Sequence, residues 1–348
     1  METIFTRYGD GSPLEMSAGD LMADLENGSA DAAERGNIPA LNKEELQYLL
    51  EIFKSPYNFV SVERGNEVIL SYDAATLKIR RVGVNVDRIQ ALQIYEKLFG
   101  ADTMDLCHVD YSFKPIKPIV TMERPILEQA LLSTHIPLFY GAMPNLGLYT
   151  QPDGPFPNPA ELLPQGKIRE AQDSYEATVD VAVNDILYTS KGMHESGADG
   201  INLDTVGAAG DADFQASLIA AEKLRETYPD ICIELGMAGE FILGMHSELE
   251  YDGVRLAGLY PHDQVKLAQK AGVTIFGPVV NTNTSESCPW NLSRAITFMK
   301  ECSRVATIPI HVNMGMGVGS VTVTDRPPID IVSRASKAMV EICRLDGL

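Results

Sequence analysis

The sequence predicts an α/β fold, a (β/α)8 barrel of the TIM type, on three observations. From residue 136 onward, short apolar strands alternate with long amphipathic helices, and this alternation requires a parallel sheet. No GxGxxG follows the first strand, as it would in a dinucleotide-binding open sheet. Polar residues instead end several strands, as in a barrel whose strand ends meet at one mouth: Asp204, Glu234, Asn281 and Asn313. An open doubly wound sheet also fits the alternation.

The alternation predicts the following elements. The strands are expected at 136–142, 199–204, 231–236, 273–276 and 308–312. The helices are expected at 168–195, after a cap at Asp211, from about 240, and at 261–271, 290–303 and 327–344. Residues 256–259 are ambiguous and could form an extra short strand.

Residues 1–135 are expected to form an α+β extension, which precedes the barrel domain at 136–348. Asn42 and Glu45 form a capping-box pattern that opens a helix to about Phe53. The other expected elements are a hairpin of 59–62 with 67–72, a helix from a cap at Asp87 to Phe99, and an extended connection at 114–118.

Composition narrows the classes of protein and partner. The chain has 348 residues, of which 45% are hydrophobic and 22% charged, as in globular proteins with a sizeable core. A net charge of −20 excludes nucleic acid and anionic membranes as favourable partners. The five cysteines form no CxxC pair, which disfavours a disulfide scaffold or structural zinc site. With no signal peptide or apolar run long enough to span a membrane, we expect a cytoplasmic location.

Three carboxylates near strand ends are the candidate catalytic residues. Asp204 ends one strand, and Glu234 lies inside another that is otherwise apolar. A charged residue there is costly to bury without a partner, so we expect Glu234 to point into a polar barrel interior. With Glu240, these side chains could hold a cation or transfer a proton. A structural salt bridge or a hydrogen-bonded core carboxylate is the alternative.

A second group of polar residues predicts a substrate-binding lining. It comprises Tyr140, Asn281, Asn283 and Asn313, although Asn residues also serve turns. The glycine-rich 315–319 loop could approach a phosphate or a large cofactor, which is a weak indication alone. No histidine has metal-binding spacing, and no nucleophile motif is recognisable. The residues alone therefore indicate a barrel enzyme with an acidic mouth.

The last residues predict a barrel that is incomplete at Leu348. The helix of 327–344 is followed by 345–348, which resembles the first residues of another strand. Each strand–helix unit here takes roughly 35 to 60 residues, so we expect that the last strands of the barrel are missing after Leu348.

Long motifs resemble the dimethylamine:corrinoid methyltransferases, the pyrrolysine-containing dimethylamine methyltransferase family. The resemblance covers essentially the whole chain and is densest from residue 99 onward. The motifs include IPLFYGAMPNLGLYTQPDGPFPNP (136–159), SGADGINLDTVGAAGDADF (196–214), FGPVVNTNTS (276–285) and the terminal PPIDIVSRASKAMVEICRLDGL (327–348).

The resemblance implies a methyl transfer from dimethylamine to the Co(I) of a separate corrinoid protein, with release of methylamine. No cofactor would be bound directly, since the corrinoid is carried by the partner protein. In this family the segment that corresponds to 346–348 is followed by pyrrolysine, encoded by an in-frame UAG codon. The resemblance therefore implies pyrrolysine at position 349, and a chain that stops at Leu348 is expected to be inactive.

Pyrrolysine would provide an imine that binds the substrate nitrogen, and the carboxylates would stabilise charge and move protons. We also expect a homo-oligomer. Two alternatives stay open: another corrinoid-linked barrel enzyme, or a non-catalytic, amber-truncated fragment.

Overall fold

The computed structural model shows a mixed α/β protein. It describes residues 3–72, 78–79, 84–85, 88–100, 102–106, 109–110, 116–143, 146–244 and 246–348. Internal contacts divide the chain into two compact units. The first unit is Met1–Val68, Tyr260–Lys266 and Gly277–Leu348, and the second is Ile69–Leu259 and Leu267–Phe276. The division into 1–135 and 136–348 was expected from the strand–helix alternation of the sequence. The two units are defined by a different criterion, internal contacts, so that division stays a prediction.

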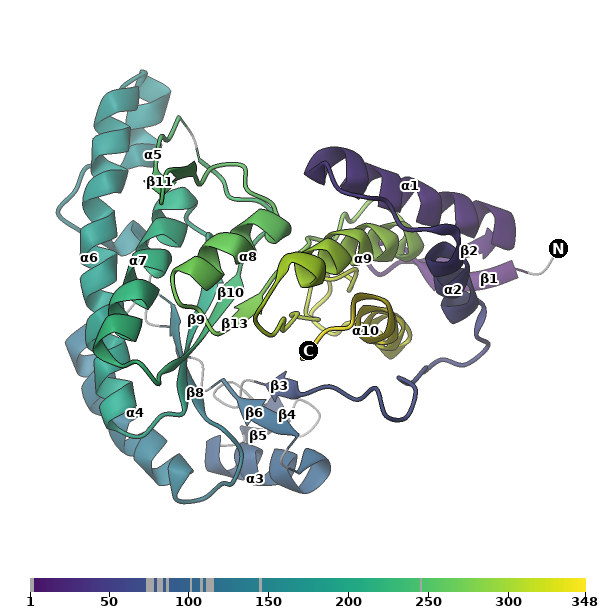
Figure 1. The fold of residues 1–348 in the computed structure, drawn as a ribbon, viewed down its shortest axis with the longest axis horizontal. Helices are drawn as coiled ribbons and strands as arrows, with labels where there is room; N and C mark the ends of the chain where they lie inside the picture. Colours follow the sequence, from purple (N-terminus) through teal and green to yellow (C-terminus); the bar gives the residue numbers. More distant parts are fainter. Residues whose placement is uncertain are drawn as a thin grey trace. The chain divides into compact units, whose positions relative to one another are not determined.

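A five-stranded sheet forms the centre of the second unit (Figure 1). Its order is β13-β10-β9-β8-β7, with β7 Val109–Asp110, β8 Phe139–Met143, β9 Gly200–Val206, β10 Cys232–Met237 and β13 Ile275–Gly277. The pairings of β7 with β8, β8 with β9 and β9 with β10 are parallel, which confirms the predicted α/β class. This order does not return to its first strand within the described residues, so the closed barrel stays a prediction.

The register of the sheet sorts its side chains onto two faces. Gly200, Asn202 and Asp204 alternate along β9 with Ile201 and Leu203, both of which are fully buried. Helices bury apolar side chains, so the face with Ile201 and Leu203 is the one covered by α6 (Ile168–Glu195) and α7 (Asp211–Thr227) (Figure 1). The opposite face therefore carries the polar residues of the strands.

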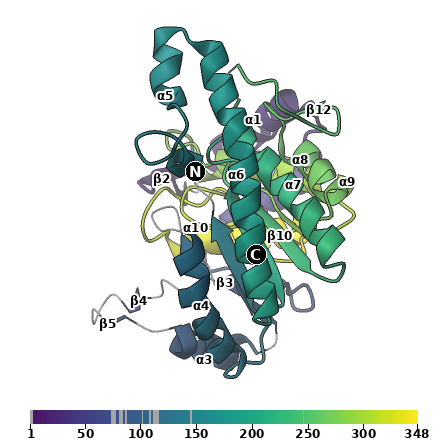
Figure 2. The same cartoon turned by 90° about the vertical axis from the view of Figure 1, so that its left-hand side faces the viewer.

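Helix α4 (Ile116–Leu131) lies beside α6 (Figure 2). A side chain at Gly192 of α6 would come within 2.5 Å of Val120, so the glycine permits this close approach. Residues 116–118 belong to α4, and the predicted extended connection is wrong there, because the first turn of a helix needs no N–H from Pro118. Residues 114 and 115 lie outside the described part of the chain.

Several short elements complete the second unit. β3 (Leu70–Tyr72) pairs in parallel with β6 (Thr103–Asp105), so the predicted hairpin of 59–62 with 67–72 is wrong. A tertiary pairing between distant segments replaced the local one. The proposed cap at Asp87 lies outside the described residues. The others are β4 (Lys78–Ile79), β5 (Val84–Asn85), α3 (Arg88–Phe99), η1 (Leu146–Tyr149), α5 (Pro159–Leu162) and η2 (Leu163–Gln165).

The predicted helix from about residue 240 is wrong. A loop and a small hairpin occupy this region, with β11 (Glu250–Tyr251) antiparallel to β12 (Val254–Arg255). Asp252 and Gly253 both have positive φ (52° and 73°), which is the backbone of a tight hairpin turn. The Asp-Gly pair was the local signal for this turn. Helix α8 (Pro261–Lys270) follows, as predicted.

Four helices and a hairpin build most of the first unit. β1 (Thr3–Arg7) pairs antiparallel with β2 (Pro13–Ser17), and the helices are α1 (Ala18–Gly36), α2 (Lys43–Lys54), α9 (Cys288–Val305) and α10 (Ile329–Cys343). The capping box at the start of α2 is confirmed, since Asn42 accepts from the Glu45 N–H and Glu45 from the Asn42 N–H. A Cβ at Gly28 would lie 2.1 Å from the Trp290 oxygen, which shows how closely α1 approaches α9.

The last residues of the chain lie beside the segment 310–312. His311 and Gly347 form a parallel bridge, and the Val312 N–H donates to the Gly347 oxygen. Neither the expected strand at 308–312 nor the one expected to begin at 345–348 is formed as a strand, and this isolated bridge is what the two segments share. None of the helices in the described part of the chain combines the length and apolar character needed to cross a bilayer.

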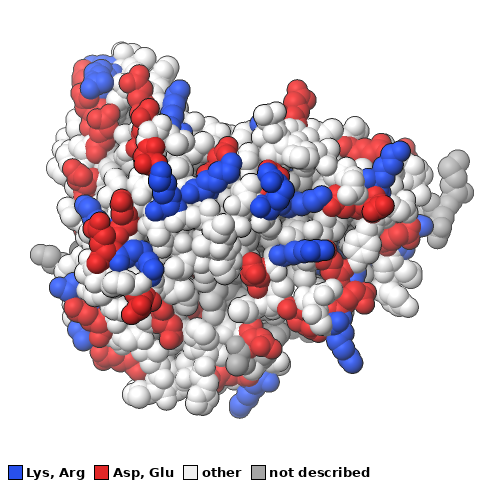
Figure 3. All heavy atoms as spheres, viewed as in Figure 1, with Lys and Arg blue, Asp and Glu red and all other residues white. Residues whose placement is uncertain are grey.

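Acidic and basic side chains alternate across the face of the molecule drawn in Figure 3. Such mixing of the two signs is common for a hydrated surface.

Candidate active site

The polar face of β9 and β10 brings two of the predicted catalytic carboxylates onto one side of the sheet. Glu234 pairs in register with Asn202, and each side chain is only 2% exposed. Asp204 lies two residues beyond Asn202 and is therefore on the same face, nearer the carboxyl end of the strand. Since burying a carboxylate without a partner is costly, this face of the sheet has to be a polar environment.

Asn202 adds an acceptor to this face. Its Oδ1 is buried and has no hydrogen-bond partner among the described residues. A buried acceptor of this kind can take a hydrogen bond from an N–H or O–H group placed beside it. Gly236 lies beside it, and a Cβ there would come 3.2 Å from Oδ1 of Asp204. The glycine therefore leaves the carboxylate of Asp204 uncovered on that side.

The backbone just after Asp204 is strained. Thr205 has a φ of 52°, in the left-handed region that a β-branched residue rarely adopts. Its N–H donates to Oδ1 of Asp204 at 2.7 Å, and its hydroxyl donates to the Asp204 backbone oxygen. Strain of this kind is typical of functional loops, and here it fixes the direction of the Asp204 carboxylate.

A second buried carboxylate, Asp213, holds the loop that follows β9. Its Oδ2 accepts from the Gly207 N–H at 3.0 Å. Burial raises the pKa of Asp213 to about 7, while hydrogen bonds from the backbone N–H groups of Ala209, Gly207 and Ala208 lower it. Asp213 thus accepts from consecutive N–H groups of the loop after β9 and holds in place the segment that follows the strained Thr205.

The neighbouring Asp211 is the first residue of α7, and Gly210 is its N-cap, so the predicted cap at Asp211 is wrong. A side chain at Gly210 would clash with the Leu243 backbone, which explains a glycine at the cap. Burial raises the pKa of Asp211, and a hydrogen bond with Ser247 lowers it. An acidic residue in the first turn also interacts favourably with the helix dipole.

The remaining predicted residues of the second unit lie elsewhere. Glu240 follows β10 and is 8% exposed, so it is buried close in sequence to the acidic face. Tyr140 is fully buried, but it pairs in register with Ile201. It therefore points to the face opposite Asn202 and Glu234, and the structure does not bring it together with the carboxylates.

Asn281, Asn283 and Asn313 belong to the first unit, and all three are exposed. Oδ1 of Asn283 accepts from the Ser285 N–H at 3.0 Å, which is a turn contact. Asn281 forms a bridge with Val318 of the glycine-rich loop, so the two predicted loops of this unit lie side by side. Among the described residues, no group of three or more His, Cys, Asp or Glu side chains could hold a metal ion.

The family follows from a match along almost the entire sequence. The family model described as dimethylamine methyltransferase (Dimeth_PyL) matches residues 2–348. The chain belongs to the dimethylamine methyltransferase family. The family resemblance noted in the sequence is thereby confirmed, and the family is one of methyltransferases that act on dimethylamine.

Two solved structures are distantly similar to this dimethylamine methyltransferase family member. The homocysteine methyltransferase MmuM from Escherichia coli, in its apo form, has a TM-score of 0.40 and 11% identity, with 78% of this chain and 95% of that chain covered. A candidate phosphonomutase from Burkholderia cenocepacia J2315 has a TM-score of 0.36 and 12% identity, with 77% and 83% covered.

Sequence reasoning missed three features of the site in this dimethylamine methyltransferase family member: Asn202, the strain at Thr205 and the loop-holding role of Asp213. The strand alternation could have placed Asn202 with Asp204, because residues two apart share a face. The role of Asp213 had a weaker signal, its position shortly after Gly207 and Gly210. The positive φ of Thr205 had none.

Proposed function

We propose that the protein transfers a methyl group from dimethylamine to the Co(I) of a corrinoid carried by a separate protein and releases methylamine. The family match over residues 2–348 supports this proposal most directly. The buried acidic face of β9 and β10 supports it independently, because dimethylamine is a cation at neutral pH. A cation gains most where carboxylates are withdrawn from water.

The carboxylates of this face would bind and orient the amine. Glu234 and Asp204 supply negative charge on one face, and Asn202 supplies an acceptor for an N–H. Transfer of a methyl cation from the protonated amine to Co(I) breaks the C–N bond and leaves neutral methylamine, so a carboxylate beside the nitrogen would keep the substrate protonated until transfer. Glu234, Asp204 and Glu240 are the residues that we assign to this role.

We place pyrrolysine at position 349 of the full gene product. The parallel bridge of His311 with Gly347 sets a register that, continued by two residues, would put residue 349 opposite Asn313. Pyrrolysine would supply an electrophilic imine able to bind the amine nitrogen. On this register Asn313 stays a proposed substrate-binding residue.

A partner protein must bring its corrinoid to the reacting methyl group. The strand ends and the loops that follow them would form the docking surface, as in other barrels where active sites lie at that end. A cytoplasmic location and a homo-oligomeric state remain further predictions for the enzyme.

The test is a methyl-transfer assay with the product of the whole gene, made in a host that inserts pyrrolysine at UAG. We expect dimethylamine-dependent methylation of the cognate Co(I) corrinoid protein and formation of methylamine. Mass spectrometry of the same sample should detect peptides that extend past Leu348 and carry pyrrolysine at 349.

The alternatives give different results in that assay. Methylation from another donor, with none from dimethylamine, would identify another corrinoid-linked enzyme. A native protein that ends at Leu348 would contradict the placement of pyrrolysine and favour a non-catalytic fragment. A protein that stops there is expected to show no transfer.

A further inference from the structure

A β-bulge in β9 lies opposite Gly236 of β10. The register of the two strands shifts by one residue there, so two residues of β9, Asp204 and Thr205, lie opposite this single residue of β10. The extra residue of β9 coincides with the positive φ of Thr205. Bulges redirect side chains and are frequent beside active sites. This bulge therefore determines how the Asp204 carboxylate lies against β10.

The backbone conformation of Gly236 does not require a glycine. Its φ is not in the left-handed region, so an alanine could adopt the same backbone. A glycine inside a strand is less stable than an alanine, because it loses more backbone freedom on folding. Such a glycine commonly marks a place where another group comes close. The reason for this glycine therefore lies in the space beside it.

The space beside Gly236 is bordered by a carboxylate oxygen. A Cβ there would lie 3.2 Å from Oδ1 of Asp204, the nearest atom, and 3.9 Å from Oδ1 of Asn202. The Asp204 oxygen is fixed in this position, since it also accepts from the Thr205 N–H at 2.7 Å. An alanine would press its methyl group against this oxygen, whereas the glycine leaves room there for about one carbon atom.

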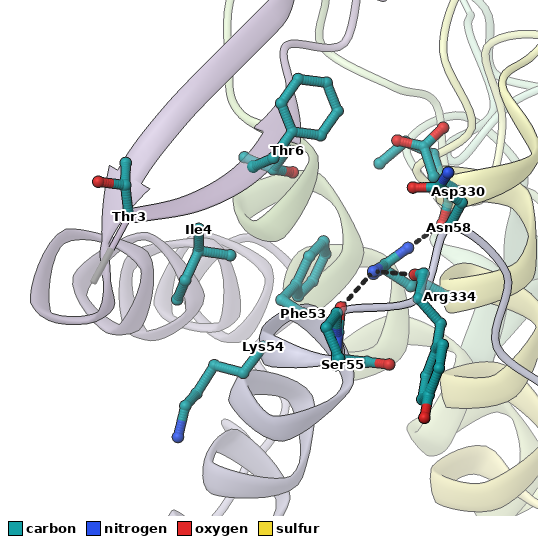
Figure 4. Close-up of a pocket in the computed structure, with 13 residues that line it drawn as sticks. Thr3, Ile4, Thr6, Phe53, Lys54, Ser55, Asn58, Asp330 and Arg334 are labelled. Atoms are coloured by element: carbon teal, nitrogen blue, oxygen red, sulfur yellow. Dashed lines mark hydrogen bonds between the residues drawn. The ribbon is translucent and has the colours of Figure 1, made fainter.

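The cavity of about 250 Å³ in the first unit shows a buried charge that is used differently (Figure 4). Its cation, Arg334, donates at 2.9 to 3.0 Å to three backbone oxygens, those of Asp330, Ser55 and Tyr57. These bonds connect the segment after α2 to α10, so this charge serves the packing of the first unit. Beside Gly236, by contrast, a charged oxygen borders the space of a missing side chain.

The space beside Gly236 is nearer the surface than the other acid of this face. Asp204, Thr205 and Gly236 are half-buried. Asn202 and Glu234, which pair with each other two residues earlier along the strands, are each only 2% exposed. A small molecule from outside would therefore meet Gly236 and the Asp204 carboxylate first.

The charge and the size of this space fit one methyl group of an alkylammonium ion. The methyl groups of dimethylammonium share its positive charge, so their C–H groups are attracted to a carboxylate oxygen. Contacts of the C–H···O type have C···O distances of about 3.3–3.6 Å. A Cβ at Gly236 would be at nearly this distance, 3.2 Å, from Oδ1 of Asp204.

We propose that Gly236 determines the amine specificity of the site. The methyl group of dimethylamine that is not transferred lies against Gly236, beside the Asp204 carboxylate. This inference rests on the methyl transfer proposed above and assigns a position to the part of the substrate that does not react.

The experiment compares dimethylammonium with methylammonium by isothermal titration of the whole gene product, at constant pH and ionic strength. Methylammonium can keep its only methyl group in the position of the transferred one, so it does not need the space at Gly236. We expect the unaltered protein to bind dimethylammonium about fourfold more tightly, which is the gain from burying one methyl group.

Gly236→Ala should reverse this preference. Binding of dimethylammonium should weaken at least about tenfold and that of methylammonium less than about twofold, because the added methyl group fills the space that only dimethylammonium uses. The KM for dimethylamine should rise by a similar factor, while the melting temperature should stay the same or rise.

Two further variants separate charge from space. Gly19→Ala, in the first turn of α1, is the matched control, since a Cβ there would come no closer than 3.7 Å to another atom. It should leave both dissociation constants unchanged. Asp204→Asn removes the charge and should weaken the binding of both cations to a similar extent.

Each other outcome overturns the inference. Equal weakening of both cations by Gly236→Ala would mean that the added methyl group displaces Asp204 and does not fill a substrate position. Unchanged binding of both would mean that the glycine serves the bulge alone. If the variant does not fold, the unaltered protein decides, and methylammonium binding as tightly as dimethylammonium contradicts the inference.

Failure of the proposed function gives a different result. An unaltered protein that neither binds dimethylammonium nor transfers its methyl group would contradict that function, and this inference with it. A protein that transfers the methyl group, with the same preference between the two cations in Gly236→Ala, would contradict this inference alone.

Discussion

In the second unit, polar side chains project from the face of a parallel sheet, whereas in the first unit they follow the strands and bond to the turns around them. Glu234 and Asn202 lie in adjacent strands, in register and almost fully buried. Asn283, by contrast, bonds to Ser285, and Asn291 of α9 bonds to the same turn. Both regions have the same types of polar residue after apolar strands, but only in the second unit do we propose that they bind a ligand.

This difference indicates which polar residues can serve catalysis or binding and which serve stability. Side chains committed to a turn lose stability when they are changed, because backbone groups lose their partners. Side chains held on a sheet face by register can be changed with less loss of fold and more loss of function. Variants of the sheet face should therefore lose activity, whereas variants of the turns should lose stability.

Glu234→Gln should have the largest effect on activity. The substitution keeps the size of the buried side chain but removes the charge that would bind a cation and the group that would hold a proton. We expect methyl transfer from dimethylamine to fall about a thousandfold, with the melting temperature nearly unchanged. The matched control, Glu226→Gln on the exposed surface of α7, should leave both unchanged. Retained activity in Glu234→Gln would assign this carboxylate to the structure alone.

Asp204→Asn should cost less, about a hundredfold or below, because the amide oxygen can still accept from the Thr205 N–H and keep the strained loop in place. A rise in KM for dimethylamine would indicate binding of the cation, and a fall in kcat would indicate a role in proton transfer. Asp230→Asn, in an exposed turn, is the control. If the variant loses the fold instead, Asp204 belongs with the turn residues of the first unit.

The sequence was a good guide where local signals and the final fold agree. The helix at 168–195 and the capping box of α2 were predicted at the right residues, because periodicity and the Asn42–Glu45 pair determine them locally. The polar face was predictable in part, since Asp204 and Glu234 end or interrupt apolar strands. Tyr140 was not distinguishable from them, because only the register of β8 against β9 shows which face it occupies.

Tertiary context decided the rest. The pairing of Leu70–Tyr72 with Thr103–Asp105 has no local signal, and a nearby hairpin was the simpler expectation. The Asp252–Gly253 turn had a clear signal, but the apolar residues before it also fit a helix.

Asn291→Ala should show the opposite pattern from Glu234→Gln. The Oδ1 of Asn291 accepts from the Asn283 N–H, and its Nδ2 donates to the backbone oxygens of Asn283, Glu286 and Ser287. Loss of these bonds should lower the free energy of unfolding by about 2–4 kcal/mol, measured by urea denaturation. Asn27→Ala, on the exposed face of α1, is the control and should change it by less than about 0.5 kcal/mol. A stable Asn291→Ala protein with impaired methyl transfer would break the comparison.

The pH dependence of stability tests the second unit by itself. Burial raises the pKa of Asp213 from an ordinary 3.8 to about 7 in the folded protein. Between these values the folded state keeps a proton that the unfolded state releases, so stability should fall as pH rises from about 4 to about 7, by up to about 1.4 kcal/mol per pH unit.

Asp213→Asn removes this titration but keeps an oxygen that can accept from the Gly207 N–H. Its free energy of unfolding should therefore lack that decline, even if the substitution lowers stability at every pH. The measurement is urea denaturation of both proteins across this pH range, and the informative quantity is the difference between the two curves. Parallel curves would mean that the backbone N–H groups of the loop hold Asp213 ionised throughout. The ionised carboxylate would then hold the loop at Thr205 in the folded protein. A turn residue of the second unit would in that case be as charged as the sheet face beside it, and the two roles would not be separate.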